Sequence, residues 1–452
     1  MALKQMDALA ALREAAGEVI EASLCEIQGG WLALVRTQDG KRLAFAAKGE
    51  NALSALWKDV EKEADVKDVH VAVMALNANN AALVRRYVKW TAPTACGTKG
   101  ASIGFSDWLG EADAVVAELF GKRQLKPVLV DFTTEDSEAL QRYFVQAVDT
   151  ATWGVLEEGY KEGYGANAAG LKTEEEIVKA LLYGYSMIGF DCSDKIDLGI
   201  EKLSDEAVDK RFEQFNETFR AALHASYLNA EFKVGTNKIT FTENQLHRIV
   251  LEYGEAIMHV QFIYNSYLKN TPWDIDFELD LSKPGKVLTP QEHYLIGNEL
   301  QRNGIKLTAI CLDPLKDAEA VNDNLQLHCE IADTFGYRLS FKNADIAMND
   351  TAAAMKYLKG KVHFKMNNIL WLSAIELAKA LDADLFGKLC AACGCEATAD
   401  AADRALVLGY RKALNPKEEG NVVVAMKAFL EAHHTEYTAA IKENVAAKLK
   451  NI

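Results

Sequence analysis

The chain has 452 residues, of which 49% are hydrophobic and 25% are charged. These proportions are ordinary for a globular protein and exclude a disordered or collagen-like chain. Fifty basic and sixty-five acidic residues leave a formal charge of −15, so the surface as a whole repels nucleic acids and anionic membranes. No apolar run approaches the ~20 residues that span a bilayer. We therefore expect a soluble, cytoplasmic protein that binds neither nucleic acid nor membrane.

The first hundred residues combine a helical pattern with short strands. The N-terminal segment is amphipathic, and residues 23–47 alternate apolar and polar positions around Gly29-Gly30 and Asp39-Gly40. Such turn residues between alternating runs indicate a β-hairpin or meander. Residues 1–98 are therefore predicted to form an N-terminal α+β cap.

From about residue 100, strand-like runs are separated by long helical stretches. Seven runs stand out: ASIGF, KPVLVDF, SMIGFDC, IDFELDL, KLTAICLD, YRLSFKN and KVHFKMN. Apolar strands that alternate with helices indicate βα units and a parallel sheet. The pattern favours a (β/α)8 TIM-type barrel over residues 99–385, although the eighth strand is not identified. No G-x-G-x-x-G or Walker-type loop appears, which argues against a nucleotide-binding fold.

The ends of several helices are marked in the sequence. Thr289-Pro290-Gln291-Glu292 has the form of a capping box with proline at the first helical position, and Gly304 suits the helix end. Thr173–Glu176 and Thr242–Gln245 repeat the Thr-x-x-Glu/Gln form. The pattern after residue 385 is helical, so residues 386–452 are predicted to form a C-terminal helical segment packed on the barrel. The sequence also suggests an inserted hairpin in FKVGTNKITFT.

Polar side chains follow most of the predicted strands. In a TIM barrel the carboxyl ends of the strands build the active site. The residues at these ends are Asp107, Asp131, Asp191, Ser282, Lys283, Asp313, Lys342, His363 and Lys365. The alternative for any one of them is a solvated loop residue or a surface ion pair.

The eight cysteines are mostly isolated in apolar surroundings, as expected of reduced thiols in a reducing compartment. Cys390, Cys393 and Cys395 instead crowd into six residues. They are either a metal site, with His433 or His434 as further ligands, or incidental thiols at a helix end.

Several segments resemble the tagaturonate/fructuronate epimerase family. They occur in family order from about residue 100 onward: SIGFSDWLG, TATWGVLEEGYKEGYGANAAGLKTEEEI, GYSMIGFDCSD, EYGEAIMHVQFIY, LTPQEHYLIGNELQRNGIKL, HCEIADTFGYRLS and KVHFKMNNILW. The family consists of metal-dependent TIM-barrel enzymes that interconvert two keturonates differing at one hydroxyl-bearing carbon. The resemblance therefore implies a barrel and an isomerase.

The resemblance also implies a divalent cation such as Zn²⁺ or Mn²⁺. Two lysines depart from the family pattern, because Lys342 replaces a histidine and Lys283 belongs to a pair that replaces two acids. A protonated ammonium is not a metal ligand. His259 and His363, with Asp107 or Asp191, are the remaining candidate ligands.

Epimerisation needs a base, an acid and an electrophile that stabilises an enolate or alkoxide. Asp107, Asp191 and His363 are the candidate proton carriers, and a lysine ammonium is the candidate electrophile in place of the metal. The predicted substrate is a small sugar acid or ketose, and its predicted binding residues are Lys283, Lys342, Lys365 and Asp131. A stronger form of this hypothesis makes Lys342 or Lys283 a nucleophile that forms a Schiff base with the substrate carbonyl.

The alternative function is a catalytically silent barrel that binds a sugar acid or another small anion. Lysines beside a histidine bind an anion whether or not it reacts. The oligomeric state stays open, with a homo-oligomer as one option.

Overall fold

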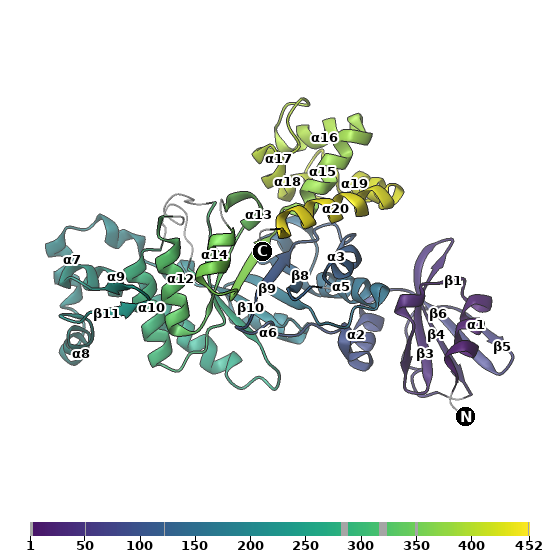
Figure 1. Ribbon diagram of the computed structural model, residues 1–452, viewed down its shortest axis with the longest axis horizontal. Coiled ribbons are helices and arrows are strands. Elements are labelled where there is room, and N and C mark those ends of the chain that lie inside the picture. The colour runs from purple at the N-terminus through teal and green to yellow at the C-terminus, as the bar shows by residue number, and fades with distance from the viewer. Residues whose placement is uncertain are drawn as a thin grey trace.

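Eight parallel strands close into a barrel in the computed structural model, which describes residues 3–49, 51–121, 123–281, 288–315, 323–348, 351–450 and 452. The order around the barrel is β10-β13-β14-β15-β16-β7-β8-β9 (Figure 1). The strands are β7 (Ser102–Phe105), β8 (Lys126–Thr133), β9 (Gly165–Leu171), β10 (Met187–Asp191), β13 (Asp276–Asp280), β14 (Ala309–Leu312), β15 (Arg338–Phe341) and β16 (Val362–Met366). The closed barrel confirms the predicted (β/α)8 fold.

Helices separate successive strands of the barrel. They are α3 (Asp113–Phe120), α4 (Thr134–Leu140), α5 (Phe144–Glu158), α6 (Glu174–Leu182), α9 (Glu243–Ile263), α10 (Pro290–Arg302), α12 (Leu325–Phe335), α13 (Ala344–Ala347), α14 (Thr351–Tyr357) and α15 (Ile369–Leu381). Thr173, Thr242 and Thr289 cap α6, α9 and α10 through their side chains, as predicted. None of the described helices is long and apolar enough to cross a membrane.

The strand that the sequence left unidentified is β9. It pairs in parallel with β8 on one side and β10 on the other. Its sequence, GANAAGL, consists mainly of glycine, alanine and asparagine, which are depleted in strands because they offer little side chain to pack. The neighbouring strands supply the packing that holds it extended.

A helical insertion lies between β10 and β13. It contains η3 (Ser193–Lys195), η4 (Leu198–Lys202), α7 (Asp205–Phe212), α8 (Glu217–Tyr227) and the first part of α9. The predicted hairpin is present as β11 (Phe232–Val234) and β12 (Asn237–Ile239), which pair antiparallel. Figure 1 shows α7 and α8 at the far end of the molecule from the N-terminal sheet.

The N-terminal residues form a separate antiparallel sheet with helices beside it. The elements are α1 (Gln5–Ala15), β1 (Glu18–Val19), η1 (Glu21–Ser23), β2 (Cys25–Ile27), β3 (Gly30–Thr37), β4 (Gly40–Lys48), β5 (Val60–Val66), β6 (Val69–Met74), α2 (Ala78–Tyr87) and η2 (Lys89–Thr91). The predicted hairpin is the β3–β4 pair, which turns at Asp39-Gly40. An ion pair from Arg85 in α2 to Asp149 in α5, at 2.8 Å, joins this part to the barrel helices.

The C-terminal residues are helical, as predicted. They form α16 (Ala383–Cys393), α17 (Arg404–Leu408), α18 (Tyr410–Ala413), α19 (Val423–Ala432) and α20 (His434–Leu449). Figure 1 places these helices together above the barrel, where α20 packs on α15 and α3. The exact division at residues 98 and 385 remains a prediction.

The interior of the barrel is polar. A TIM barrel usually fills its interior with branched apolar side chains. Here the apolar strand residues, such as Ile103, Phe190 and Leu279, belong to the core shared with the surrounding helices. Many of the alternate residues are polar and bond to one another across the barrel, and they include Ser102, Asp131, Asn167, Glu278, Arg338, His363 and Lys365. The alternation of Lys361–Met366 thus separates a helix-facing side from a barrel interior.

Lys365 is the centre of this polar interior. Its Nζ donates to Glu278 Oε1 at 2.5 Å and lies 3.8 Å from Asp131 Oδ1, and all three side chains are at most 2% exposed. Burial disfavours the charged lysine, but the carboxylates of Asp131 and Glu278 outweigh it and raise the lysine pKa. Gly104 leaves the room for Asp131, because a Cβ at residue 104 would lie 2.6 Å from Asp131 Oδ2.

Replacement of Lys365 by methionine tests this arrangement. Lys365→Met leaves the buried Glu278 carboxylate without its counter-charge, so we expect a loss of about 3–5 kcal/mol in the free energy of unfolding. Lys361→Met on the same strand is the control. It removes a pair with Asp333 whose two side chains are 38% and 28% exposed, at 2.8 Å, and should cost about 1 kcal/mol or less. Equal losses in denaturant titrations of the two variants would contradict the assignment.

Candidate active site

A cavity of about 840 Å³ opens at the carboxyl ends of the barrel strands. We call it the mouth cavity. Residues at or just after the ends of β8, β9, β10, β13, β14, β15 and β16 line it, and residues of α17 and α18 complete it. Its polar lining includes Asp131, Thr133, Lys172, Asp191, Asp194, Asp280, Asp313, Lys342, Lys365, Asn367, Tyr410 and Arg411. This is the end of the barrel where TIM-barrel enzymes hold their substrates.

Four charged side chains, two acids between two lysines, lie along the mouth cavity. Lys172 follows β9, Asp191 ends β10, Asp280 ends β13 and Lys342 follows β15. We call them the mouth row. Lys172 Nζ lies 3.8 Å from Asp191 Oδ2, and Lys342 Nζ donates to Asp280 Oδ2. Asp191 and Asp280 are close enough to affect each other's charge, so the two acids share the space between the two lysines.

The mouth row shifts the protonation of its members. Burial raises the pKa of Asp191, and the nearby Asp280 carboxylate raises it further. The backbone N–H of Ser193 donates to Asp191 Oδ1 at 2.8 Å and partly opposes that rise. Burial disfavours the Lys342 ammonium, but Asp280 outweighs this effect and raises the lysine pKa well above its ordinary value. Lys342 is therefore a fixed cation, and this argues against a neutral amine that forms a Schiff base.

The floor of the mouth cavity is the buried polar network. Asp131 accepts from Asn167 Nδ2 at 2.9 Å and from Asn367 Nδ2 at 3.4 Å. Lys365 lies between Asp131 and Glu278. The network fixes the side chains that face the cavity from below.

The C-terminal helices supply one wall of the mouth cavity. Tyr410 donates to Asp136 Oδ1 at 2.5 Å, and Arg411 Nε donates to the same oxygen at 2.8 Å. Trp108 stacks on Tyr410 with ring centroids 3.3 Å apart. These contacts tie α18 to the start of α4, so the C-terminal segment takes part in the site.

The structure brings five of the sequence-predicted residues to the mouth cavity: Asp131, Asp191, Asp313, Lys342 and Lys365. Asp107 is not among the residues that line it. Its carboxylate accepts the backbone N–H groups of Gly110 and Ala112 at 2.8 and 2.7 Å, which holds the turn after β7. Ser282 and Lys283 lie outside the described residues.

The two histidines proposed as metal ligands lie in different surroundings. His363 is fully buried in the barrel interior, where its Nδ1 lies 2.9 Å from Ser102 Oγ. Burial, Lys365 and Arg338 lower the His363 pKa and keep the ring neutral. His259 lies on α9, and its ring packs against Phe190, whose side chain points to the helices. The structure does not place the two imidazoles at one site.

A divalent cation does not fit the mouth cavity as the described residues arrange it. The carboxylates of Asp280 and Glu278 already bond to the ammonium groups of Lys342 and Lys365. Within the described ranges, one group of three His, Cys, Asp or Glu side chains has the spacing to hold a metal ion, and it consists of His224, Glu243 and His247 in the helical insertion. The three clustered cysteines are not part of that group.

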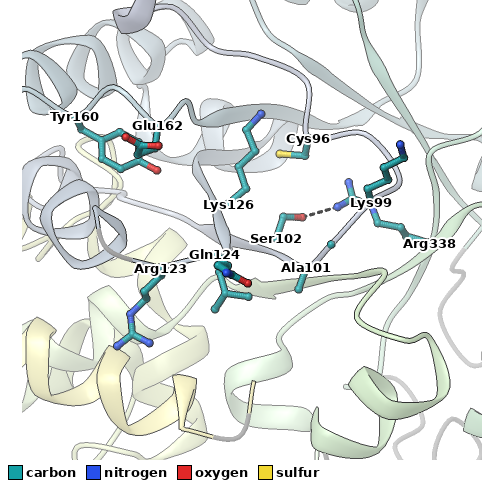
Figure 2. A pocket seen from close by; sticks show the side chains of 12 residues that line it. Cys96, Lys99, Ala101, Ser102, Arg123, Gln124, Lys126, Tyr160, Glu162 and Arg338 are labelled. Atoms are coloured by element: carbon teal, nitrogen blue, oxygen red, sulfur yellow. Dashed lines mark hydrogen bonds between the residues drawn. The ribbon is translucent and has the colours of Figure 1, made fainter.

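A second cavity, of about 290 Å³, lies at the opposite end of the barrel. Its lining includes Ser102, Lys126 and Arg338, which are the first residues of β7, β8 and β15. Figure 2 shows Arg338 bonded to Ser102 at its edge, and the bond measures 2.8 Å. This end of a TIM barrel contributes to stability more often than to catalysis.

Sequence reasoning missed several residues of the site. Asp280 was visible in DFELDL, where Asp276, Glu278 and Asp280 alternate with apolar residues. Lys172 follows β9, the strand that was not recognised. Nothing in the sequence pattern signalled Tyr410 or Arg411, because their place at the barrel depends on how the C-terminal helices pack.

The comparisons with known proteins agree with this fold. Residues 20–419 match the family described as tagaturonate epimerase. A tagaturonate/fructuronate epimerase from Thermotoga maritima is 28% identical over 383 residues, which cover 82% of this chain and 78% of that protein. Two crystal structures of a fructuronate-tagaturonate epimerase from Cohnella laeviribosi, with one and two glycerol molecules, cover 99% of both chains with TM-scores of 0.87 and 0.86 at 24% and 25% identity. The match over most of its length shows that the chain belongs to the tagaturonate epimerase family.

Proposed function

We propose that this chain interconverts two keto-uronates that differ at one hydroxyl-bearing carbon, with tagaturonate and fructuronate as the substrates to test first. Family membership supports an epimerase acting on uronate sugars. The observation that carries the proposal for this chain is the mouth row, since it sets Asp191 near the Asp280 carboxylate that fixes the Lys342 ammonium, in a cavity of about 840 Å³. The proposed reaction uses these side chains directly.

Substrate binding begins with the carboxylate of the uronate. Lys172 is 40% exposed and reaches the cavity from the end of β9, where it pairs with Asp194 at 3.2 Å and lies near Asp191. A lysine ammonium has three N–H donors, so it can donate to a substrate carboxylate while it still donates to an acidic side chain of the protein. The chain has a net charge of −15, so the substrate carboxylate needs a direct contact with a lysine in the cavity.

Lys342 is the proposed electrophile. Two routes lead to epimerisation: proton removal next to the ketone, or cleavage of a carbon–carbon bond followed by its re-formation. In both routes negative charge develops on the ketone oxygen. An ammonium held in position by Asp280 stabilises that charge by donating hydrogen bonds to the oxygen. This role requires no metal ion at the mouth row.

Asp191 is the proposed proton carrier. Its raised pKa makes the ionised carboxylate a stronger base than an ordinary aspartate. In the first route it takes the proton from carbon, and in the second it takes the proton from the hydroxyl group. In the second route the same carboxyl group returns the proton to the alkoxide after the carbon–carbon bond has re-formed on the other face of the carbonyl, so no net proton is consumed. The first route needs in addition an acid on the opposite face of the enolate, because return of the proton from the same face restores the starting epimer.

The role of Lys342 is tested by replacing it with an uncharged residue and with another cationic residue. We expect Lys342→Met to lower kcat by about 100-fold or more, because the ketone oxygen loses its cation, and Lys342→Arg to retain more activity. Lys356→Met on α14, an exposed position, is the control. Conversion of fructuronate to tagaturonate is followed by NMR at a temperature at which each variant is folded. Full activity of Lys342→Met would exclude Lys342 as the electrophile. If the wild-type protein binds fructuronate but does not convert it, the result would indicate the catalytically silent barrel instead.

The pH dependence of kcat/KM tests Asp191. The ionised carboxylate is the base, so activity rises with pH as Asp191 loses its proton, with a midpoint above the ordinary value of 3.8 because the pKa is raised. Asp280→Asn removes the neighbouring negative charge and should move this midpoint to lower pH. Asp191→Asn should remove the rise of kcat/KM at acidic pH together with most of the activity. A rise at acidic pH that survives in Asp191→Asn would assign the base to another group.

A further inference from the structure

We propose that His224, Glu243 and His247 bind one zinc ion that fastens α8 to α9 in the helical insertion. The Nε2 atoms of His224 and His247 lie 2.9 Å apart. One ligand atom from each of the three side chains lies within 4.8 Å of the others. None of the three lines the mouth cavity, so the proposed ion is structural and separate from the epimerisation site.

The backbone presents the ligands in a form suited to a metal. Glu243 and His247 are four residues apart at the start of α9, which places them on one helix face, and His224 reaches them from α8. Zinc binds histidine nitrogen at about 2.0–2.1 Å in tetrahedral geometry. Two nitrogens at this distance from one ion are about 3.3 Å apart, so the pair needs to open by only a few tenths of an ångström. Glu243 supplies the third ligand and water the fourth.

Asp209 prepares His247 for this role. Its Oδ1 lies 2.7 Å from His247 Nδ1. A carboxylate at this position accepts the Nδ1–H hydrogen and leaves the lone pair on Nε2, which is the arrangement of many zinc-bound histidines. His224 then donates its Nε2–H to that lone pair in the metal-free protein. When zinc binds, the His224 hydrogen moves to Nδ1 and both Nε2 lone pairs face the ion.

Phe212 holds the two rings in place. Its ring stacks on His247 with centroids 3.8 Å apart at 14°, and lies 5.6 Å from the His224 ring at 7°. His247 is buried, and its ring is enclosed between α7 and α9. An apolar ring beside the ligands restricts water and strengthens the attraction between the cation and its ligands.

The choice of zinc follows from the ligand types. Two imidazoles and one carboxylate suit zinc, whereas magnesium and calcium take oxygen ligands. The alternative explanation of the contact between His224 and His247 is a hydrogen bond between two neutral imidazole rings without a metal ion. The two readings differ in metal content and in the effect of zinc on stability.

The experiment measures zinc binding by the full-length chain after treatment with a chelator. We expect one zinc ion per chain in a titration against a chromophoric competitor, and a higher Tm when zinc is returned. Asp209→Asn should weaken the affinity by about 10- to 100-fold, and His224→Gln and His247→Gln should weaken it further. Circular dichroism establishes that each variant is folded.

His259→Gln is the matched control, because it removes a histidine from the same helix without touching the group. It should bind zinc as the wild type does. Absence of zinc binding by the wild type would overturn the proposal, as would loss of zinc in His259→Gln but not in His247→Gln. Since metal content and Tm are measured without substrate, the result is independent of the proposed epimerase activity.

Discussion

The buried ammonium of Lys365 is the interaction on which the barrel depends. A charge that is 2% exposed is tolerable only when opposite charges surround it, and Glu278 and Asp131 provide them from two other strands. Apolar packing between strands and helices holds the outside of the barrel. The inside is held by charge and hydrogen bonding, so its residues have to be satisfied as a set.

Acidic and basic side chains are also paired in the mouth cavity. Each cation of the mouth row has an acid beside it, as Lys342 has Asp280 and Lys172 has Asp191 and Asp194. An anionic sugar therefore does not meet unpaired positive charge. In the proposed reaction it binds by joining existing pairs, and the burial of Asp191 next to Asp280 raises the Asp191 pKa. The same buried pairing that stabilises the barrel thus prepares the chemistry proposed for its mouth.

The sequence predicted the barrel well because most strands carry strong alternation. The clearest of them, β13, β15 and β16, combine apolar residues toward the helices with polar residues toward the interior, and this period is visible in the sequence alone. The eighth, β9, is built from glycine, alanine and asparagine, and only its neighbours make it a strand. Its loss from the prediction also hid Lys172, the residue that follows it.

The site was predicted in part for the same reason. A residue at a strand end is expected at the mouth, but the sequence does not tell how deep it lies. His363 and Lys365 are two residues apart on one face of β16, yet only Lys365 reaches the cavity. Asp107 follows β7 directly, but its carboxylate is used by two backbone N–H groups of its own loop. Depth and local hydrogen bonding are properties of the folded chain.

Lysine in place of a metal ligand changes what the proposed site does. A divalent cation and an ammonium both stabilise an oxyanion, but the ammonium does so by donating hydrogen bonds of fixed direction. Asp280 holds Lys342 protonated, so its charge persists through the reaction and it needs no metal supply. An ammonium carries a smaller charge than a divalent cation and so stabilises an oxyanion less. The ion pair with the buried Asp280 partly offsets this difference, because it fixes the position of the Lys342 ammonium before the substrate binds. A cation placed in advance loses little free energy to reorganisation in the transition state, and that is the condition under which one ammonium is an effective electrophile.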